Sequence, residues 1–265
     1  MSVWVFLRGL TRESRHWGAF VDTFEAEVTG AAVVAIDLPG NGSMNYLPSP
    51  TRVEDLAEWC RRELSARGIR GPYYLLGMSL GAMVATEWAH SFSNEVRGCV
   101  LINGSLRPFS PFYQRLRPAN YLEIFKLALL GGSAGESESM ILRMTTRRRD
   151  TVLLLPAWIA WRRERPVTRL NALRQLLAAS RYRAPANAPA APTLVLASTA
   201  DALVDVKCSR EIASRWMTHY AEHPEAGHDL TLDDGAWVAR QVCIWLTQSA
   251  SLRSADKRTS TARRA

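Results

Sequence analysis

Six short apolar segments, alternating with amphipathic ones, set the strongest limit on how this chain can fold. Several of the six are continuous apolar runs, which is typical of parallel strands buried on both faces of a sheet. Because strands that alternate with helices are joined by right-handed crossovers, we expect an α/β fold with a mostly parallel, doubly wound sheet of about six strands. The expected strands are 3–7, 31–38, 73–78, 98–103, 193–198 and 217–223, and the expected helices are 17–28, 53–67, 80–91, 206–217 and 236–246.

The segment 105–190 breaks this alternation. It holds helical runs such as NYLEIFKLALL and LNALRQLLAAS without a convincing strand, so we expect a helical cap over the carboxyl ends of the strands. Residues 1–104 and 191–250 then form one core, which a chain of 265 residues with 47% hydrophobic residues can bury as a single domain. Residues 251–265 are polar, basic and aperiodic, which predicts a disordered tail.

The charge of the chain is regional. Its formal net charge is +8, but the segment 105–190 alone carries 15 Lys or Arg and 5 Asp or Glu, a net charge of +10. No nucleic-acid-binding motif or aromatic-interleaved basic groove accompanies this charge, so we expect no nucleic-acid partner. The arginines are open to two interpretations: they solvate the outer faces of cap helices, or they attract an acidic partner.

Cysteine spacing and the opening residues bear on cofactors and location. Cys60, Cys99, Cys208 and Cys243 are scattered and match neither metal-ligand nor redox spacing, so we expect reduced thiols and no metal site. The opening MSVWVFLRGL lacks the basic start and the cleavage site of a secretion signal, and no apolar run reaches the roughly 18 residues of a membrane span. We therefore expect a cytoplasmic protein without a membrane anchor.

One junction in the chain points to chemistry. Ser79 stands between Gly77 and Gly81 in GMSLG, after an expected strand and before an expected helix. A turn this sharp leaves no room for side chains beside the serine, which is itself held strained and exposed. The following helix points its amino end at the same place and favours developing negative charge. This context predicts a nucleophile rather than an ordinary helix cap.

A nucleophilic serine needs a base, and the base needs an acid that orients it. His228 follows the last expected strand on a loop with Gly227 and is the favoured base, because the other four histidines fit packing, surface or capping positions. The loop after the preceding strand offers two acids. We favour Asp201, because Asp205 stands where a helix begins and can cap it. The strand before that ends at Asn103, which has no carboxylate.

Two backbone N–H groups must also stabilise a tetrahedral intermediate. We expect them from Leu80, directly after the serine, and from Leu10, in the loop after the first strand. These parts predict a serine hydrolase that attacks an ester or thioester carbonyl through an acyl-enzyme, without a metal or organic cofactor. Acyl transfer, and C–C bond hydrolysis or elimination, remain open on the same residues. A non-catalytic binding protein is the alternative of another class.

The order Ser79, Asp201, His228, each after a strand, resembles the α/β-hydrolase superfamily over nearly the whole chain apart from the tail. The segment DLPGNGS (37–43) is similar to that family's DxPGxGxS turn, and Trp17 matches its tryptophan in the first helix. A serine nucleophile excludes the branches with an aspartate nucleophile, the haloalkane dehalogenases and epoxide hydrolases.

This chain departs from the superfamily pattern in two ways. The family usually has His-Gly after the opening strand, where this chain has Arg8 and Gly9. Because backbone amides make the oxyanion contact, we expect the oxyanion hole to survive, and Arg8 forms either a structural ion pair or a contact with an anionic substrate. The sequence also begins at the strand that leads to the oxyanion loop, so we do not expect the family's two leading antiparallel strands.

Within the superfamily, the DLPGNGS segment, the short core and the cap are most similar to the pimeloyl-[acyl-carrier-protein] methyl ester esterases of biotin synthesis. The resemblance implies hydrolysis of a small ester on an acyl chain that an acidic acyl carrier protein holds. Basic cap residues would attract that carrier: Arg143, Arg147, Arg148 and Arg149. Apolar cap residues would line an acyl pocket: Phe109, Phe112, Trp158 and Trp161.

Overall fold

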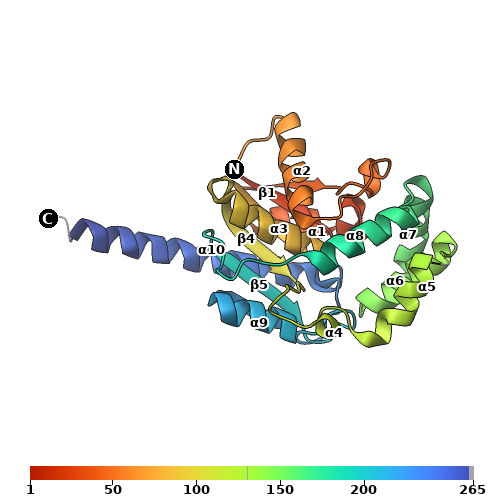
Figure 1. Cartoon of the computed structure of the whole chain (residues 1–265). Coiled ribbons are helices and arrows are strands. Elements are labelled where there is room, and N and C mark those ends of the chain that lie inside the picture. The colour runs from red at the N-terminus through yellow and green to blue at the C-terminus, as the bar shows by residue number, and fades with distance from the viewer. Residues whose placement is uncertain (130, 263–265) are drawn as a thin grey trace.

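Figure 1 shows the computed structural model of the chain, which describes residues 1–129 and 131–262, without the side chains of 127–129 and 250–262. Its centre is a six-stranded parallel sheet in the order β2-β1-β3-β4-β5-β6. This confirms the predicted α/β fold with a doubly wound sheet. The strands are β1 (Ser2–Leu7), β2 (Ala31–Ile36), β3 (Tyr73–Met78), β4 (Val96–Ile102), β5 (Thr193–Ser198) and β6 (His219–His223).

Helices cover both faces of the sheet. Successive residues of a strand point to opposite faces, so each strand contributes side chains to two separate cores. Val5 and Leu7 of β1 point to the face that is covered by α2 (Val53–Ala66), α3 (Leu80–Ser91) and α9 (Lys207–Trp216). Trp4 and Phe6 point to the other face, against α1 (Phe20–Glu27) and α10 (Leu230–Ala262). None of these four side chains is exposed, so β1 is buried on both faces, as its apolar sequence predicts.

Between β4 and β5, helices are the regular elements of the described residues, together with one isolated bridge between Arg107 and Arg183. In Figure 1, α5, α6 and α7 lie together at the right of the sheet, and α8 runs back across it toward β5. The helices are α4 (Phe112–Arg115), α5 (Tyr121–Leu129), α6 (Ala134–Thr145), α7 (Thr151–Glu164) and α8 (Arg169–Arg181). We call this segment the cap.

Two helices differ from the sequence expectations. A short 3-10 turn (Ser14–Trp17) and then Gly18, with a φ of 52°, precede α1, so this helix begins later than expected. The last helix, α10, continues to Ala262, through most of the segment predicted to be a disordered tail. Residues 236–262 contain no Gly or Pro that would end a helix, and 263–265 lie outside the described residues. No described helix is both long enough and apolar enough to cross a membrane.

The sheet order places the predicted site where the chain changes direction. From β1 the chain moves outward to β2, then returns to add β3 on the other side of β1. Open α/β sheets bind ligands at the carboxyl ends of strands on either side of such a switch point. Gly9 follows β1 and Ser79 follows β3, so both stand at this point.

Candidate active site

Ser79 occupies a sharp turn between β3 and α3. Its φ of 56° and ψ of −114° lie where L-residues are rarely found, and its amide donates to the carbonyl oxygen of Ile102 over 3.0 Å. The flanking glycines permit the turn. A Cβ on Gly77 would lie 2.3 Å from the carbonyl oxygen of Gly81, and one on Gly81 would lie 2.0 Å from that of Leu7. The local backbone is therefore a strained turn from strand to helix, as the sequence predicts for this junction.

The loop after β1 packs directly against this serine. A Cβ on Gly9 would lie 3.2 Å from the Cβ of Ser79, closer than ordinary van der Waals contact. The amides of Leu10 and Leu80, which the sequence predicts to form an oxyanion hole, donate to no acceptor among residues 1–129 and 131–262. The Ser79 hydroxyl likewise has no hydrogen-bond partner in this part of the chain.

His228 and Asp201 form a buried pair beyond the carboxyl ends of β6 and β5. Nδ1 of His228 lies 2.7 Å from Oδ2 of Asp201, and the two side chains are 4% and 2% exposed. The other oxygen of Asp201 accepts from the amides of Leu203, over 2.7 Å, and Val204, over 2.9 Å. Burial acts to lower the pKa of His228, but the charge and hydrogen bond of Asp201 outweigh it and leave this pKa raised. The structure thus brings these two predicted residues together.

Asn103 has a larger part in the site than its lack of a carboxylate suggests. Its Nδ2 donates to the carbonyl oxygen of His228, over 2.8 Å, and to the hydroxyl of Ser198, over 3.0 Å. Its Oδ1 accepts from the amide of Ser198 over 2.8 Å. With a φ of 46°, it also adopts a left-handed conformation that asparagine tolerates better than most residues. The sequence signal for this role is only an asparagine at a strand end.

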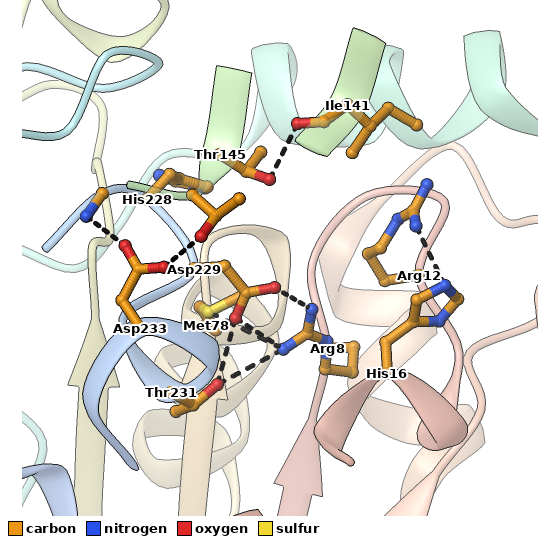
Figure 2. A network of polar contacts seen from close by, with 12 residues as sticks. Arg8, Arg12, His16, Met78, Ile141, Thr145, His228, Asp229, Thr231 and Asp233 are labelled. Atoms are coloured by element: carbon orange, nitrogen blue, oxygen red, sulfur yellow. Dashed lines mark hydrogen bonds and ion pairs between the residues drawn. The ribbon is translucent and has the colours of Figure 1, made fainter. Parts of the chain in front are cut away.

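Arg8 pairs with Asp229, the residue after His228 (Figure 2). Its Nη1 and Nη2 donate to the two carboxylate oxygens of Asp229, over 3.1 and 2.6 Å. Its guanidinium carbon lies 4.7 Å from the ring centre of Trp17, and Arg8 is only 1% exposed. Of the two interpretations of Arg8, these contacts favour the structural ion pair over contact with a substrate. The sequence signal for the partner is an acidic residue directly after the expected base.

The end of α6 is attached to the loop that carries His228 (Figure 2). Asp233, a few residues beyond His228, accepts three hydrogen bonds from the two segments. The donors are the amides of Gly227 (2.6 Å) and Arg147 (3.0 Å) and the hydroxyl of Thr146. Gly227 also has no room for a Cβ, which would lie 2.7 Å from a carbonyl oxygen at the end of α6. The cap therefore helps to hold the loop of the predicted base, which the sequence does not indicate.

A second buried network links the loop after β1 to the cap. Glu138 of α6 accepts from Arg12, over 2.7 and 3.2 Å, and from Arg162 of α7, over 2.6 Å. Burial acts to raise the pKa of Glu138, but the two guanidinium groups outweigh it and hold this pKa below its usual value. Nε2 of His16 lies 2.9 Å from Nη1 of Arg12. Burial, together with the cations of Arg12 and Arg8, lowers the pKa of His16 well below its ordinary value.

The aromatic residues predicted to line an acyl pocket have other partners. Phe109 packs in the core against a tryptophan of α9, with ring centres 5.6 Å apart, and Phe112 is 73% exposed. Trp158 and Trp161 pack edge-on against His16, with ring centres 4.7 and 5.4 Å apart. These contacts do not support the pocket assignment. The sequence marks these residues as apolar but does not say which neighbour each one faces.

The four arginines proposed to bind a carrier divide into two pairs. Arg147 donates twice to the carbonyl oxygen of Ala200, over 2.9 and 2.7 Å, and Arg148 donates to a carbonyl oxygen of α10 over 3.1 Å. Arg143 and Arg149 are exposed, and neither makes a hydrogen bond or ion pair with a described residue. Only the second pair is therefore unengaged within the described chain.

The remaining sequence alternatives have structural roles. Asp205 accepts from the first amide of α9 over 3.0 Å, as expected of a residue at a helix start. His223 lies 3.3 Å from Asp234 at the kink of α10. All four cysteines are free thiols; three of them are buried and Cys243 is half-buried.

Comparison with known proteins agrees with this architecture. The chain matches the model of the alpha/beta hydrolase family over residues 4–241. Biotin biosynthesis bifunctional protein BioHC of Teredinibacter turnerae is 37% identical over 102 residues, which are 38% of this chain but only 17% of that protein. The enol-lactonase from Burkholderia xenovorans has a TM-score of 0.75 and 17% identity, covering 93% of this chain and 91% of that one.

A thermophilic esterase from Thermogutta terrifontis has a TM-score of 0.71 and 20% identity, covering 94% of this chain and 90% of that one. Structural similarity at such low identity shows a shared fold and not a shared substrate. The family model, in contrast, spans most of the chain, from within β1 to within α10. The chain therefore belongs to the alpha/beta hydrolase family.

Proposed function

We propose that this protein is a serine hydrolase that cleaves a carboxylic ester or thioester through an acyl-enzyme. Ser79 would be the nucleophile, His228 the general base and Asp201 the acid that orients the base. The buried hydrogen bond of 2.7 Å between Nδ1 of His228 and Oδ2 of Asp201 carries the proposal. Membership of the alpha/beta hydrolase family supports hydrolase chemistry in general.

The tautomer of His228 follows from this hydrogen bond. With Nδ1–H engaged by Asp201, Nε2 is the nitrogen that can accept a proton from Ser79. Asp201 offsets the burial that would otherwise lower the pKa of His228, which keeps the imidazole basic enough to take the proton of Ser79. Asp201 stabilises the imidazolium that forms in between.

The reaction then has two balanced steps. First, Oγ of Ser79 bonds to the carbonyl carbon while its proton moves to Nε2 of His228, and that proton passes to the alcohol or thiol as its bond to carbon breaks. Next, Nε2 takes a proton from water, whose oxygen attacks the acyl carbon, and the proton returns to Ser79 as the acid leaves. The amides of Leu10 and Leu80 would stabilise the oxyanion in both steps.

Hydrolysis of p-nitrophenyl esters of increasing chain length tests the proposal. We expect Ser79→Ala and His228→Gln to lower kcat by about 10³-fold or more, with thermal unfolding close to wild type. Ser65→Ala, an exposed serine in α2, is the matched control and should leave the rate unchanged. A Ser79→Ala variant as active as this control would refute the proposed nucleophile.

We also propose that the substrate is a small ester on an acyl chain carried by an acidic carrier protein. The exposed Arg143 and Arg149 and the net charge of +10 over residues 105–190 support this idea, since opposite charge steers association. The similarity to a protein named for biotin biosynthesis gives separate support.

Charge reversal at these two arginines tests the carrier. Arg143→Glu with Arg149→Glu should raise KM for a methyl ester on acyl carrier protein, most strongly at low salt, and leave a free p-nitrophenyl ester unaffected. Arg62→Glu with Arg70→Glu, at exposed positions in α2 and in the loop after it, is the control for the same change in net charge. Equal effects on the two substrates would remove the carrier from the proposal and leave the esterase intact.

A further inference from the structure

The ion pair between Arg8 and Asp229 joins the two loops on which the proposed chemistry depends (Figure 2). Arg8 directly precedes Gly9, which packs against Ser79, and Asp229 directly follows His228. The hydrogen bonds of 3.1 and 2.6 Å use both oxygens of the carboxylate. Such bidentate pairing fixes orientation as well as distance, so each loop limits the movement of the other.

The surroundings of the pair leave neither charge to water. The two side chains are 1% and 3% exposed. Thr231 accepts from Arg8 over 3.4 Å and donates to Asp229 over 3.1 Å. Burial acts to raise the pKa of Asp229, but Arg8 outweighs it and holds this pKa below its usual value. Removal of one partner would leave the other as an uncompensated buried charge.

We propose that Arg8 and Asp229 are positioning residues whose ion pair holds His228 in register with the loop beside Ser79 and balances the charge next to its imidazole. The inference rests on the proposed function, because it gives the pair a part in the work of His228. It extends that function by assigning a role to the arginine found where the family usually has histidine.

The charges that act on His228 come from several elements. Burial lowers its pKa, and Asp201, in the loop after β5, raises it; Asp229 adds to the rise and Arg8 opposes it. Arg147, in the cap, donates to the carbonyl oxygen of Ala200, the residue before Asp201. Since Arg8 and Asp229 oppose each other, removing either charge should leave the other unbalanced at the imidazole.

Three variants separate charge balance from a merely structural role. Asp229→Asn should lower the pKa of His228, Arg8→Gln should raise it, and the double variant should bring it back toward wild type. The measurement is the NMR titration of the His228 imidazole, identified by its absence in His228→Gln, together with the pH profile of kcat/KM. Both single variants should also lose about 10- to 100-fold in kcat, because misplacement of the base slows reaction.

Shifts of the same sign in both single variants, or no shift in either, would overturn the inference. Arg8→Lys is a further test where the other variants unfold. It keeps the charge but not the bidentate geometry, so the His228 titration should stay at wild type while kcat falls. The NMR readout does not need activity. If the pKa of His228 shifts in opposite directions in the two single variants but no variant or wild type has esterase activity, only the proposed function is refuted. If wild type is an esterase that uses Ser79 but the pKa of His228 is the same in wild type and both single variants, only the role of the ion pair is refuted.

Discussion

Asn103 donates a hydrogen bond from Nδ2 to the carbonyl oxygen of His228, over 2.8 Å, while its Oδ1 accepts from the amide of Ser198. One side chain thereby holds the end of β5, from which Asp201 follows, against the loop of the predicted base. The geometry of the pair formed by His228 and Asp201 therefore depends on a residue that hydrogen-bonds to neither the imidazole nor the carboxylate.

Substitution of Asn103 should affect stability and rate together. Asn103→Gly loses the side-chain hydrogen bonds in a buried place, at a cost of about 2 kcal/mol in the free energy of unfolding. Asn103→Ala should cost about 1 kcal/mol more, because its φ of 46° is unfavourable for a residue with a Cβ. Urea unfolding measures both values, and kcat should fall by about tenfold in each. Equal stability of the two variants would argue against the strain component.

Gly81 should tolerate no side chain. A Cβ there would lie 2.0 Å from a carbonyl oxygen of β1, so Gly81→Ala should lower the free energy of unfolding by about 3 kcal/mol or prevent folding. Gly135→Ala is the matched control, because a Cβ at this position in α6 comes no closer than 3.6 Å to any neighbour. It should be neutral or slightly stabilising. Thermal unfolding compares the two, and similar behaviour would contradict the close approach of α3 to β1.

Arg147 should matter for every substrate, unlike Arg149. Arg147 donates to the carbonyl oxygen of Ala200, next to Asp201, so Arg147→Ala should lower kcat for a free p-nitrophenyl ester about fivefold, as loss of ~1 kcal/mol implies. Arg149→Ala lacks this contact and should leave the same ester unaffected. Identical rates for the two variants would show that the cap contact does not support the acid loop.

His16 should make the protein less stable in mild acid. Burial, with Arg12 and Arg8, lowers its pKa in the folded state, so only the unfolded state takes up its proton below about pH 6.5. Its contribution to stability is therefore present above that pH and lost as the pH falls below it. In His16→Gln, urea unfolding should change less between about pH 8 and about pH 5.5 than in wild type. Equal changes in the two proteins would contradict a neutral His16.

Periodicity and turn residues predict most of the fold, because they record local physical requirements. The apolar runs at 73–78 and 193–198 coincide with β3 and β5, since strands buried on both faces admit few polar residues. The turn at Ser79 can also be predicted from the sequence, because nearby backbone leaves no room for a Cβ at either of its two glycines. The ends of helices are harder to predict from the sequence, as the extension of α10 to Ala262 shows.

Contacts between distant segments are what the sequence does not reveal. Asp233 accepts a hydrogen bond from the amide of Arg147, just after α6 and 86 residues earlier in the chain. No spacing rule connects these two residues. Trp158 and Phe109 are recognisably apolar, but their neighbours, His16 and the core side of α9, depend on how the cap packs. Asp229 is visible in the sequence as the acid next to His228, whereas its pairing with Arg8 depends on the three-dimensional arrangement of two loops.

Covalent labelling with a fluorophosphonate reports directly on whether Ser79 is a nucleophile, because the probe reacts with an activated serine and not with an ordinary hydroxyl. The experiment is peptide mapping by mass spectrometry after labelling wild type, Ser79→Ala and His228→Gln. We expect one probe per wild-type chain, on the peptide that contains Ser79, no labelling of Ser79→Ala and strongly slowed labelling of His228→Gln. Labelling at another serine, or equal labelling of wild type and His228→Gln, would rule out Ser79 as a nucleophile activated by His228.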